Sequence, residues 1–388
     1  MRFFMKKRFH YLDILKCIAI FSVCFYHFSA VSVDLSGGFS RAVLVNRWFY
    51  TLNSICVPVF MMVNGALLLS RPLNIRKHYR SLALFCAVYW LWRVITFVLL
   101  GAAAGYDFSA LGAGDVINHL VLMKDFGSPL LVDHFWFIIM YIRIQLILPL
   151  LHCVFNMERK DSAISCAVIM AVLWISCFAV KDYSLVAAAL PAAFCALFTD
   201  SLTAYSPFTG IYGTMIFFFL LGGIIVRYAD RSRKIHPAVY AFVFAAAAAV
   251  QTVVYMVEHI TLGAGSDLVF GRYNTTTNIV MCVSLFMLAY RCEGIFEKHP
   301  KIFAPFETAG QNTISIFYLH WLAGKLVLPM PDIPDGYIVS VITIALMVAV
   351  CTAVSIVCRN IPVVKYMFGV VPAAKSGKNT AGEKAVKV

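Results

Sequence analysis

Long apolar runs alternate with short polar segments along nearly the whole chain. Because a helix crosses a bilayer with about 20 predominantly apolar residues, each run of that length predicts a transmembrane span. Ten runs qualify, at 11–31, 48–69, 81–103, 134–156, 162–180, 210–227, 236–257, 272–290, 311–328 and 337–358. The pattern therefore predicts an all-α protein, a polytopic membrane bundle of about ten transmembrane helices.

One further apolar stretch, 185–198, does not fit this pattern. It is short, is interrupted by Pro191 and is followed by polar residues. Non-helical backbone at membrane depth is tolerated only where protein or water surrounds it. We therefore expect an outer-surface or re-entrant segment here rather than an eleventh span.

Composition supports a membrane location for the chain. Of its 388 residues, 61% are hydrophobic and only 13% are charged, which excludes an ordinary soluble domain of this size. The formal net charge of +13 does not indicate nucleic-acid binding, because the basic residues cluster in short gaps between apolar runs. We expect no nucleic-acid partner and attribute the charge to orientation in the membrane.

The positions of lysine and arginine predict that orientation, since these residues accumulate in cytoplasmic loops. With the N-terminus inside, most of the 32 lie in six cytoplasmic segments. These segments are 1–10, 70–80, 157–161, 227–235, 291–301 and 359–388. Both termini are thus predicted to be cytoplasmic, with one membrane domain over 1–360 and a basic, partly disordered tail over 361–388.

The first predicted span carries three ionisable residues, although an ionisable group inside a membrane is costly and usually functional. Asp13 and Lys16 are three residues apart, which places them on one helix face within pairing distance. From Lys16 to His27 the helix makes roughly three full turns and rises about 16 Å, so His27 returns to that face. The alternative is an interfacial pair, with Lys16 extending to lipid headgroups and His27 in an interfacial belt.

This stretch, "RFHYLDILKCIAIFSVCFYHF", resembles the first helix of the acyltransferase-3 family of membrane acyltransferases. The family signature is an Arg, a Leu-Asp pair, a basic residue and a His after ten intervening residues, and it falls on Arg8, Leu12–Asp13, Lys16 and His27. Later segments are similar to other family helices, in the same order. They are "VPVFMMVNGALLL" (57–69), "HFWFIIMYIRIQLILPLL" (134–151), "FFFLLGGIIV" (217–226) and "NTISIFYLHWL" (312–322).

The resemblance implies transfer of an acyl group, usually acetyl, from a cytoplasmic thioester to a hydroxyl of a glycan or lipid-linked sugar. Acetyl-CoA would then be the donor substrate, and the protein would lie among the lipids of the bacterial cytoplasmic membrane as a multi-pass enzyme. Lys16 stands where the family more often has Arg, and it lacks the bidentate fork of a guanidinium. The continuation "WFIIMYIRIQ" differs from the "WSLxxE" of one branch that modifies peptidoglycan or lipopolysaccharide, and the chain is more similar to the branch acting on surface polysaccharide intermediates.

Acyl transfer requires a base near the acceptor hydroxyl and positive charge near the thioester. We predict that His27 is this base, or transiently carries the acyl group, and that Lys16, held by Asp13, positions the donor. Arg93 and Arg143 lie in the middle of predicted spans and are predicted to bind donor phosphate or stabilise charge. The alternative for Arg93, which follows two tryptophans in "WLWR", is a structural cation–π contact.

Four further residues are predicted to face inward and bind substrate, namely Asn64, Trp136, Tyr318 and His320. Two of them have a structural alternative. His320 would then be a satisfied core histidine, and Trp136 an anchor at the membrane interface.

No motif indicates a metal site or another nucleophile. The cysteines lack metal-ligand spacing, and there is no GxSxG sequence. A transporter or flippase for a glycan or lipid precursor remains an alternative, because ten spans with intramembrane charges also describe many carriers. A scaffold within a polysaccharide export system is a second alternative. Dependence on a thioester donor would distinguish an enzyme from both.

Overall fold

The computed structural model describes residues 9–29, 40–120, 133–179, 182, 208, 210–232, 234–262, 273–327 and 337–368. These residues form helices and connecting turns, with no strand among them. The stretch at 185–198, predicted to be re-entrant or at the outer surface, lies outside the described residues.

The first half of the bundle contains α1 (His10–Phe28), α2 (Arg41–Leu52), α3 (Cys56–Leu68), α4 (Ile75–Ala103), α5 (Ala113–Leu120), α6 (Trp136–Phe155) and α7 (Arg159–Trp174). The second half contains α10 (Gly210–Tyr228), α11 (Pro237–Leu262), α12 (Thr276–Arg291), α13 (Glu293–Lys298), α14 (Pro300–Gln311), α15 (Thr313–Leu322), α16 (Tyr337–Asn360) and α17 (Val364–Met367).

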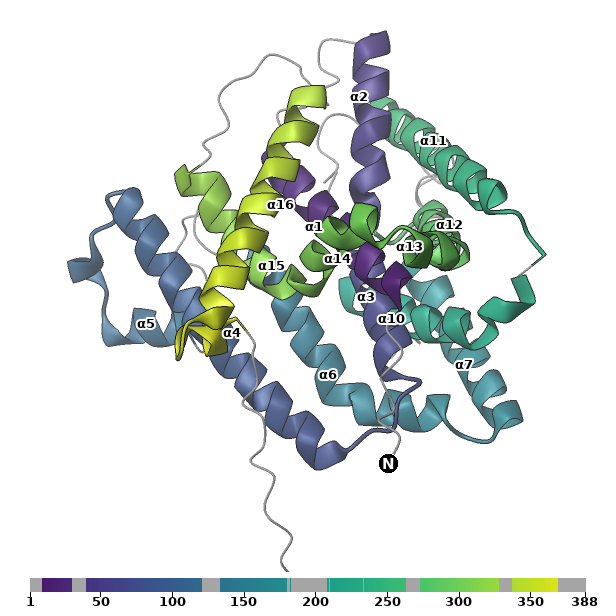
Figure 1. The fold of residues 1–388 in the computed structure, drawn as a ribbon, viewed down its shortest axis with the longest axis horizontal. Coiled ribbons are helices and arrows are strands. Elements are labelled where there is room, and N and C mark those ends of the chain that lie inside the picture. The colour runs from purple at the N-terminus through teal and green to yellow at the C-terminus, as the bar shows by residue number, and fades with distance from the viewer. Residues whose placement is uncertain are drawn as a thin grey trace, which may run out of the picture.

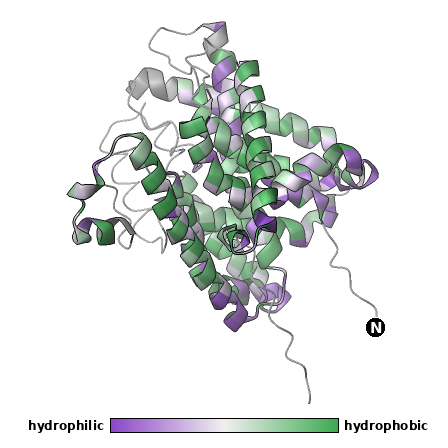
Figure 2. Ribbon diagram, turned by 60° about the vertical axis from the view of Figure 1, so that its left-hand side comes forward, coloured by the Kyte–Doolittle hydropathy of each residue, from purple (hydrophilic) through white to green (hydrophobic). Residues whose placement is uncertain are grey.

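Each of the ten predicted spans coincides with an apolar helix, or with a run of joined helices, in the described part of the chain. Eight of these are long and apolar enough to cross a membrane, and Thr276–Arg291 and Thr313–Val327 are shorter. Hydrophobic residues dominate the helices, whereas hydrophilic residues gather at helix ends and turns (Figure 2). The prediction of an all-α, polytopic membrane bundle is confirmed.

Helix boundaries differ from the predicted ones where a helix continues into polar sequence. The predicted span at 48–69 is preceded by residues from Arg41 onward that are already helical, and α4 begins at Ile75 rather than at 81. The Asn74 side chain caps α4 by accepting a hydrogen bond from the backbone N–H of Lys77 at 2.9 Å. Hydropathy alone did not mark these starts, because a cap stabilises a helix without apolar residues.

The predicted cytoplasmic segment 291–301 contains structure that its polar sequence did not predict. It forms the short helix α13 and the beginning of α14. Both helices contact α1, and they hold the N-terminal end of that helix.

The first span is the centre of the arrangement. Figure 1 shows α1 in the middle of the bundle, and it contacts α3, α12, α14, α15 and α16. Most of its residues are buried, including Asp13 and the fully buried Leu15, Ala19 and Cys24. A helix with ionisable groups on it is therefore enclosed by protein, as the cost of charge in hydrocarbon requires.

Two glycines allow α3 and α10 to touch backbone to backbone. A Cβ built on Gly65 of α3 would lie 1.7 Å from the carbonyl oxygen of Phe219, and one built on Gly222 of α10 would lie 1.9 Å from that of Met62. Small residues at helix interfaces permit this approach, which compensates for the missing hydrophobic effect between helices in lipid. The glycines thereby fix the position of α3.

The membrane domain was predicted to end at 360, and α16 ends at Asn360. The chain then folds back on α4. Trp92 donates its indole N–H to the carbonyl oxygen of Met367 at 2.7 Å, and its ring lies 5.4 Å from that of Phe368. The first residues of the predicted tail are thus part of the packed structure, and 369–388 lie outside the described residues.

We expect Gly222→Ala to destabilise the bundle by about 1–3 kcal/mol, because the added methyl group forces α3 and α10 apart. The midpoint of thermal unfolding in detergent measures the effect. Gly294→Ala is the matched control, since a Cβ at Gly294 of α13 meets no atom within 4 Å. Equal midpoints for the two variants would contradict the close helix contact.

Candidate active site

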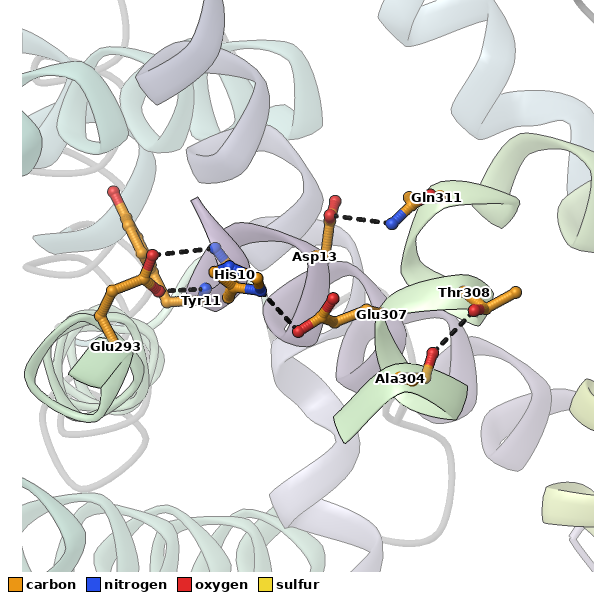
Figure 3. A network of polar contacts seen from close by, with 8 residues as sticks. All are labelled: His10, Tyr11, Asp13, Glu293, Ala304, Glu307, Thr308 and Gln311. Carbon is orange, nitrogen blue, oxygen red and sulfur yellow. Dashed lines mark hydrogen bonds and ion pairs between the residues drawn. The ribbon is translucent and has the colours of Figure 1, made fainter. Parts of the chain in front are cut away.

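The N-terminal end of α1 holds the predicted acid–base pair. The Lys16 Nζ lies 2.7 Å from the Asp13 Oδ1. Gln311 Nε2 donates to the Asp13 Oδ2 at 3.3 Å (Figure 3). Asp13 is buried and Lys16 half-buried. The carboxylate therefore holds the ammonium group in place.

Carboxylates from two other helices anchor the same end of α1. Glu293 of α13 accepts hydrogen bonds from the backbone N–H groups of His10 and Tyr11, at 3.0 and 2.6 Å. Glu307 of α14 lies 2.7 Å from Nδ1 of His10 (Figure 3). The first N–H groups of a helix have no partner within it and favour negative charge, so Glu293 satisfies them. These contacts fix the position of the Asp13–Lys16 pair relative to α13 and α14.

Lys16 lines the larger of two neighbouring cavities in the bundle, with a volume of about 280 Å³. Asn64 and Tyr318, both predicted to bind substrate, line it too. The buried Tyr318 hydroxyl has no hydrogen-bond partner, and its ring stacks on that of Trp92 with centroids 5.2 Å apart. Asn64 donates its amide to the carbonyl oxygen of Phe60 at 2.8 Å. Most of the remaining lining is aromatic or aliphatic.

The other end of α1 meets a cluster of three histidines. The ring centroids of His27 and His320 are 5.8 Å apart, and those of His134 and His320 are 5.6 Å apart. The indole of Trp321 stacks on His134 at 4.7 Å and lies edge-on to His27 at 5.1 Å. His134 and His320 are buried, whereas the His27 side chain remains accessible.

A hydrogen bond defines the tautomer of one of these imidazoles, that of His320. Nδ1 of His320 donates to the carbonyl oxygen of Phe317 at 2.6 Å, which leaves Nε2 as an acceptor. That Nε2 is buried without a partner, and so are both ring nitrogens of His134. Buried polar atoms are almost always paired, and an unpaired one costs about 1–3 kcal/mol. Three unpaired ring nitrogens close together are therefore typical of a site that binds a polar ligand.

His27 and His134 line the second cavity, whose volume is about 40 Å³. The predicted substrate residue Trp136 lines it as well, together with Cys56 and Tyr273. His320 reaches this group through its ring contacts with the other two histidines. The structure therefore brings His27, Trp136 and His320 together at this end.

Three phenylalanine side chains form the boundary that the two cavities share. Phe60 of α3, Phe137 of α6 and Phe317 of α15 line both of them. The centroid of Phe137 lies 5.8 Å from that of Phe60 and 5.3 Å from that of Phe317. We call these three rings the aromatic partition.

The two predicted arginines lie in different places. Arg93 is buried, donates to the Tyr89 hydroxyl at 3.1 Å and is close enough to His134 to act on it electrostatically. Arg143 is exposed on the far side of α6, where its guanidinium lies 4.2 Å from the Tyr212 ring centroid. It lines a separate pocket between α6 and α10. The structure thus does not place Arg143 with Lys16 or His27.

Sequence reasoning did not single out His134, Trp321 or the aromatic partition. His134 had a usable signal, since it lies two residues before Trp136 at the start of a predicted span. The phenylalanines had none, because the chain contains 32 of them. Despite the three imidazoles, no group of His, Cys, Asp or Glu side chains in the described ranges is placed to hold a metal ion.

No match was found among curated proteins or among solved structures. The acyltransferase domain that defines the acyltransferase-3 family matches residues 9–359, which include both cavities and every residue of the site described above. The chain therefore belongs to the acyltransferase-3 family and is a membrane acyltransferase.

Proposed function

We propose that this acyltransferase moves an acetyl group from cytoplasmic acetyl-CoA to a hydroxyl of a cell-surface glycan or lipid-linked sugar, in the cytoplasmic membrane of a bacterium. The observation that carries the proposal is that one helix, α1, presents Lys16 to the larger cavity and His27 to the smaller. Donor and acceptor then approach the reacting carbon from opposite ends of that helix.

The larger cavity suits the extended pantetheine arm of the donor. At about 280 Å³ it is near the lower end of small-molecule sites, so it holds the arm while the nucleotide stays outside. Lys16, oriented by Asp13, supplies positive charge to the donor. The pocket of Arg143 is not part of this path, and the proposal assigns that residue no contact with the donor.

His27 acts as general base. Its imidazole takes the proton of the acceptor hydroxyl while the hydroxyl oxygen attacks the thioester carbonyl carbon. The oxyanion then collapses, the carbon–sulfur bond breaks, and the CoA thiolate takes the proton from the imidazolium. The products are the acetyl ester and CoA. Arg93, buried near His134, provides positive charge that favours the oxyanion.

A second route uses the same residues. The His27 nitrogen attacks the thioester, and CoA leaves as the thiol with the imidazole proton. The acceptor hydroxyl oxygen then attacks the acyl carbon, the carbon–nitrogen bond breaks, and the hydroxyl proton returns to the imidazole. In both routes His27 is indispensable. A transporter or a scaffold would need neither a thioester nor this imidazole.

We expect His27→Ala to lower acetyl transfer at least about 100-fold, because a positioned general base contributes at least that factor. Purified protein in detergent is supplied with acetyl-CoA radiolabelled in the acetyl group and a lipid-linked glycan extract, and label in the lipid fraction is counted. His236→Ala, an exposed histidine in the turn before α11, is the control and should retain activity. Full activity of His27→Ala would refute the assigned role, and wild-type protein that neither binds nor uses the donor would favour a transporter.

We expect Lys16→Met to raise KM for acetyl-CoA about tenfold or more. A hydrogen bond to a charged group contributes about 1.5–3 kcal/mol, and every 1.4 kcal/mol is about a factor of ten in affinity. Lys16→Arg keeps the charge beside Asp13 and should restore most of the loss in KM. An unchanged KM in Lys16→Met, with kcat alone reduced, would show that Lys16 does not hold the donor.

A further inference from the structure

The aromatic partition divides the residues of the site into two sets. Lys16, Asn64 and Tyr318 line the larger cavity only, and His27 and His134 line the smaller cavity only. The three rings come from three different helices and are the described residues common to both linings. A group that passes from the cavity of Lys16 to that of His27 by this shared boundary therefore passes along these rings.

The two cavities differ greatly in size. The cavity beside His27 has a volume of about 40 Å³, against about 280 Å³ for the cavity beside Lys16. An acetyl group has three non-hydrogen atoms, a methyl, a carbonyl carbon and an oxygen. A butyryl group has two more carbons and needs correspondingly more of the smaller cavity.

The partition also differs from ordinary core packing. Rings inside a close-packed core have protein on both faces, whereas Phe60, Phe137 and Phe317 each border two cavities. The Phe317 ring is held by His134 and His320, with centroids 5.6 and 5.5 Å away. Phe137 contacts the other two rings and is only half-buried. Its replacement by a smaller residue therefore opens the partition between Phe60 and Phe317.

We propose that the aromatic partition sets the length of the acyl group that this enzyme transfers, admitting acetyl to the cavity of His27 and excluding longer chains. The inference rests on the proposed function and extends it from donor class to donor selectivity. The three rings contact the acyl chain and have a purely steric role. His27 carries out the proton transfer or acyl transfer.

The test compares kcat/KM for acetyl-CoA and butyryl-CoA, each radiolabelled in the acyl group, with a lipid-linked glycan extract as acceptor. We expect Phe137→Ala to raise the ratio of butyryl to acetyl transfer about tenfold or more, since each methylene accommodated in an apolar pocket changes selectivity by about 10–200-fold. Phe85→Ala is the matched control, because Phe85 is a half-buried ring that lines the larger cavity only. Its ratio should equal that of the wild type.

The outcomes separate this inference from the proposed function. Wild-type protein that transfers no acyl group from either donor refutes the proposed function. Wild-type protein that uses acetyl-CoA and butyryl-CoA equally well, or an unchanged ratio in Phe137→Ala, refutes the length limit alone. If Phe137→Ala does not purify as a monodisperse protein, Phe60→Leu and Phe137→Leu remove less volume, and a ratio unchanged in both has the same meaning.

Discussion

The free-energy cost of charge inside a bilayer is the constraint on which the rest of this structure depends. Asp13 and Lys16 lie on an apolar helix, where an ionised group is tolerated only if it is paired and turned away from lipid. The pair is therefore enclosed by protein, and α1, which carries it, occupies the middle of the bundle (Figure 1). Because the N-terminal end of α1 is held in place, the position of His27 is set as well, about 16 Å from Lys16 along the helix axis.

Contacts remote from the chemistry maintain this geometry. Glu293 and Glu307 hold the first turn of α1, and a Cβ on Gly310 would lie 1.9 Å from the carbonyl oxygen of Asp13, so α14 lies directly against that turn. On the other side, the glycine contact between α3 and α10 positions α3, which carries both Asn64 and Phe60. The two cavities thus depend on helix packing as much as on the residues that line them.

The sequence predicted the spans, and it singled out several of the residues that line the two cavities of the candidate site, for physical reasons. Apolar runs of bilayer length are an almost complete description of membrane helices, and the fixed helical period alone predicts Asp13, Lys16 and His27 on one face. The helical period of a sequence does not predict which helices contact one another. For that reason the separation of Arg143 from the site, the proximity of His134 to His320, and the joint lining by Phe60, Phe137 and Phe317 required the structure. The helices α13 and α14 were not predicted, because short helices with polar residues lack long apolar runs.

A membrane enzyme that passes an acyl group between two sides must also keep those sides separate. Under the proposed function, Lys16 faces donor that comes from one side and His27 faces acceptor that comes from the other, and an open aqueous channel between them would carry protons and ions along with substrate. A constriction lined by apolar rings excludes water when no substrate occupies it, because polar groups to hydrate an ion are absent. His134, whose imidazole nitrogens are unpaired, lines the smaller cavity, which these rings share with the cavity of Lys16. Under the proposed function, the same rings would both limit acyl length and keep the base from exchanging protons directly with the donor side.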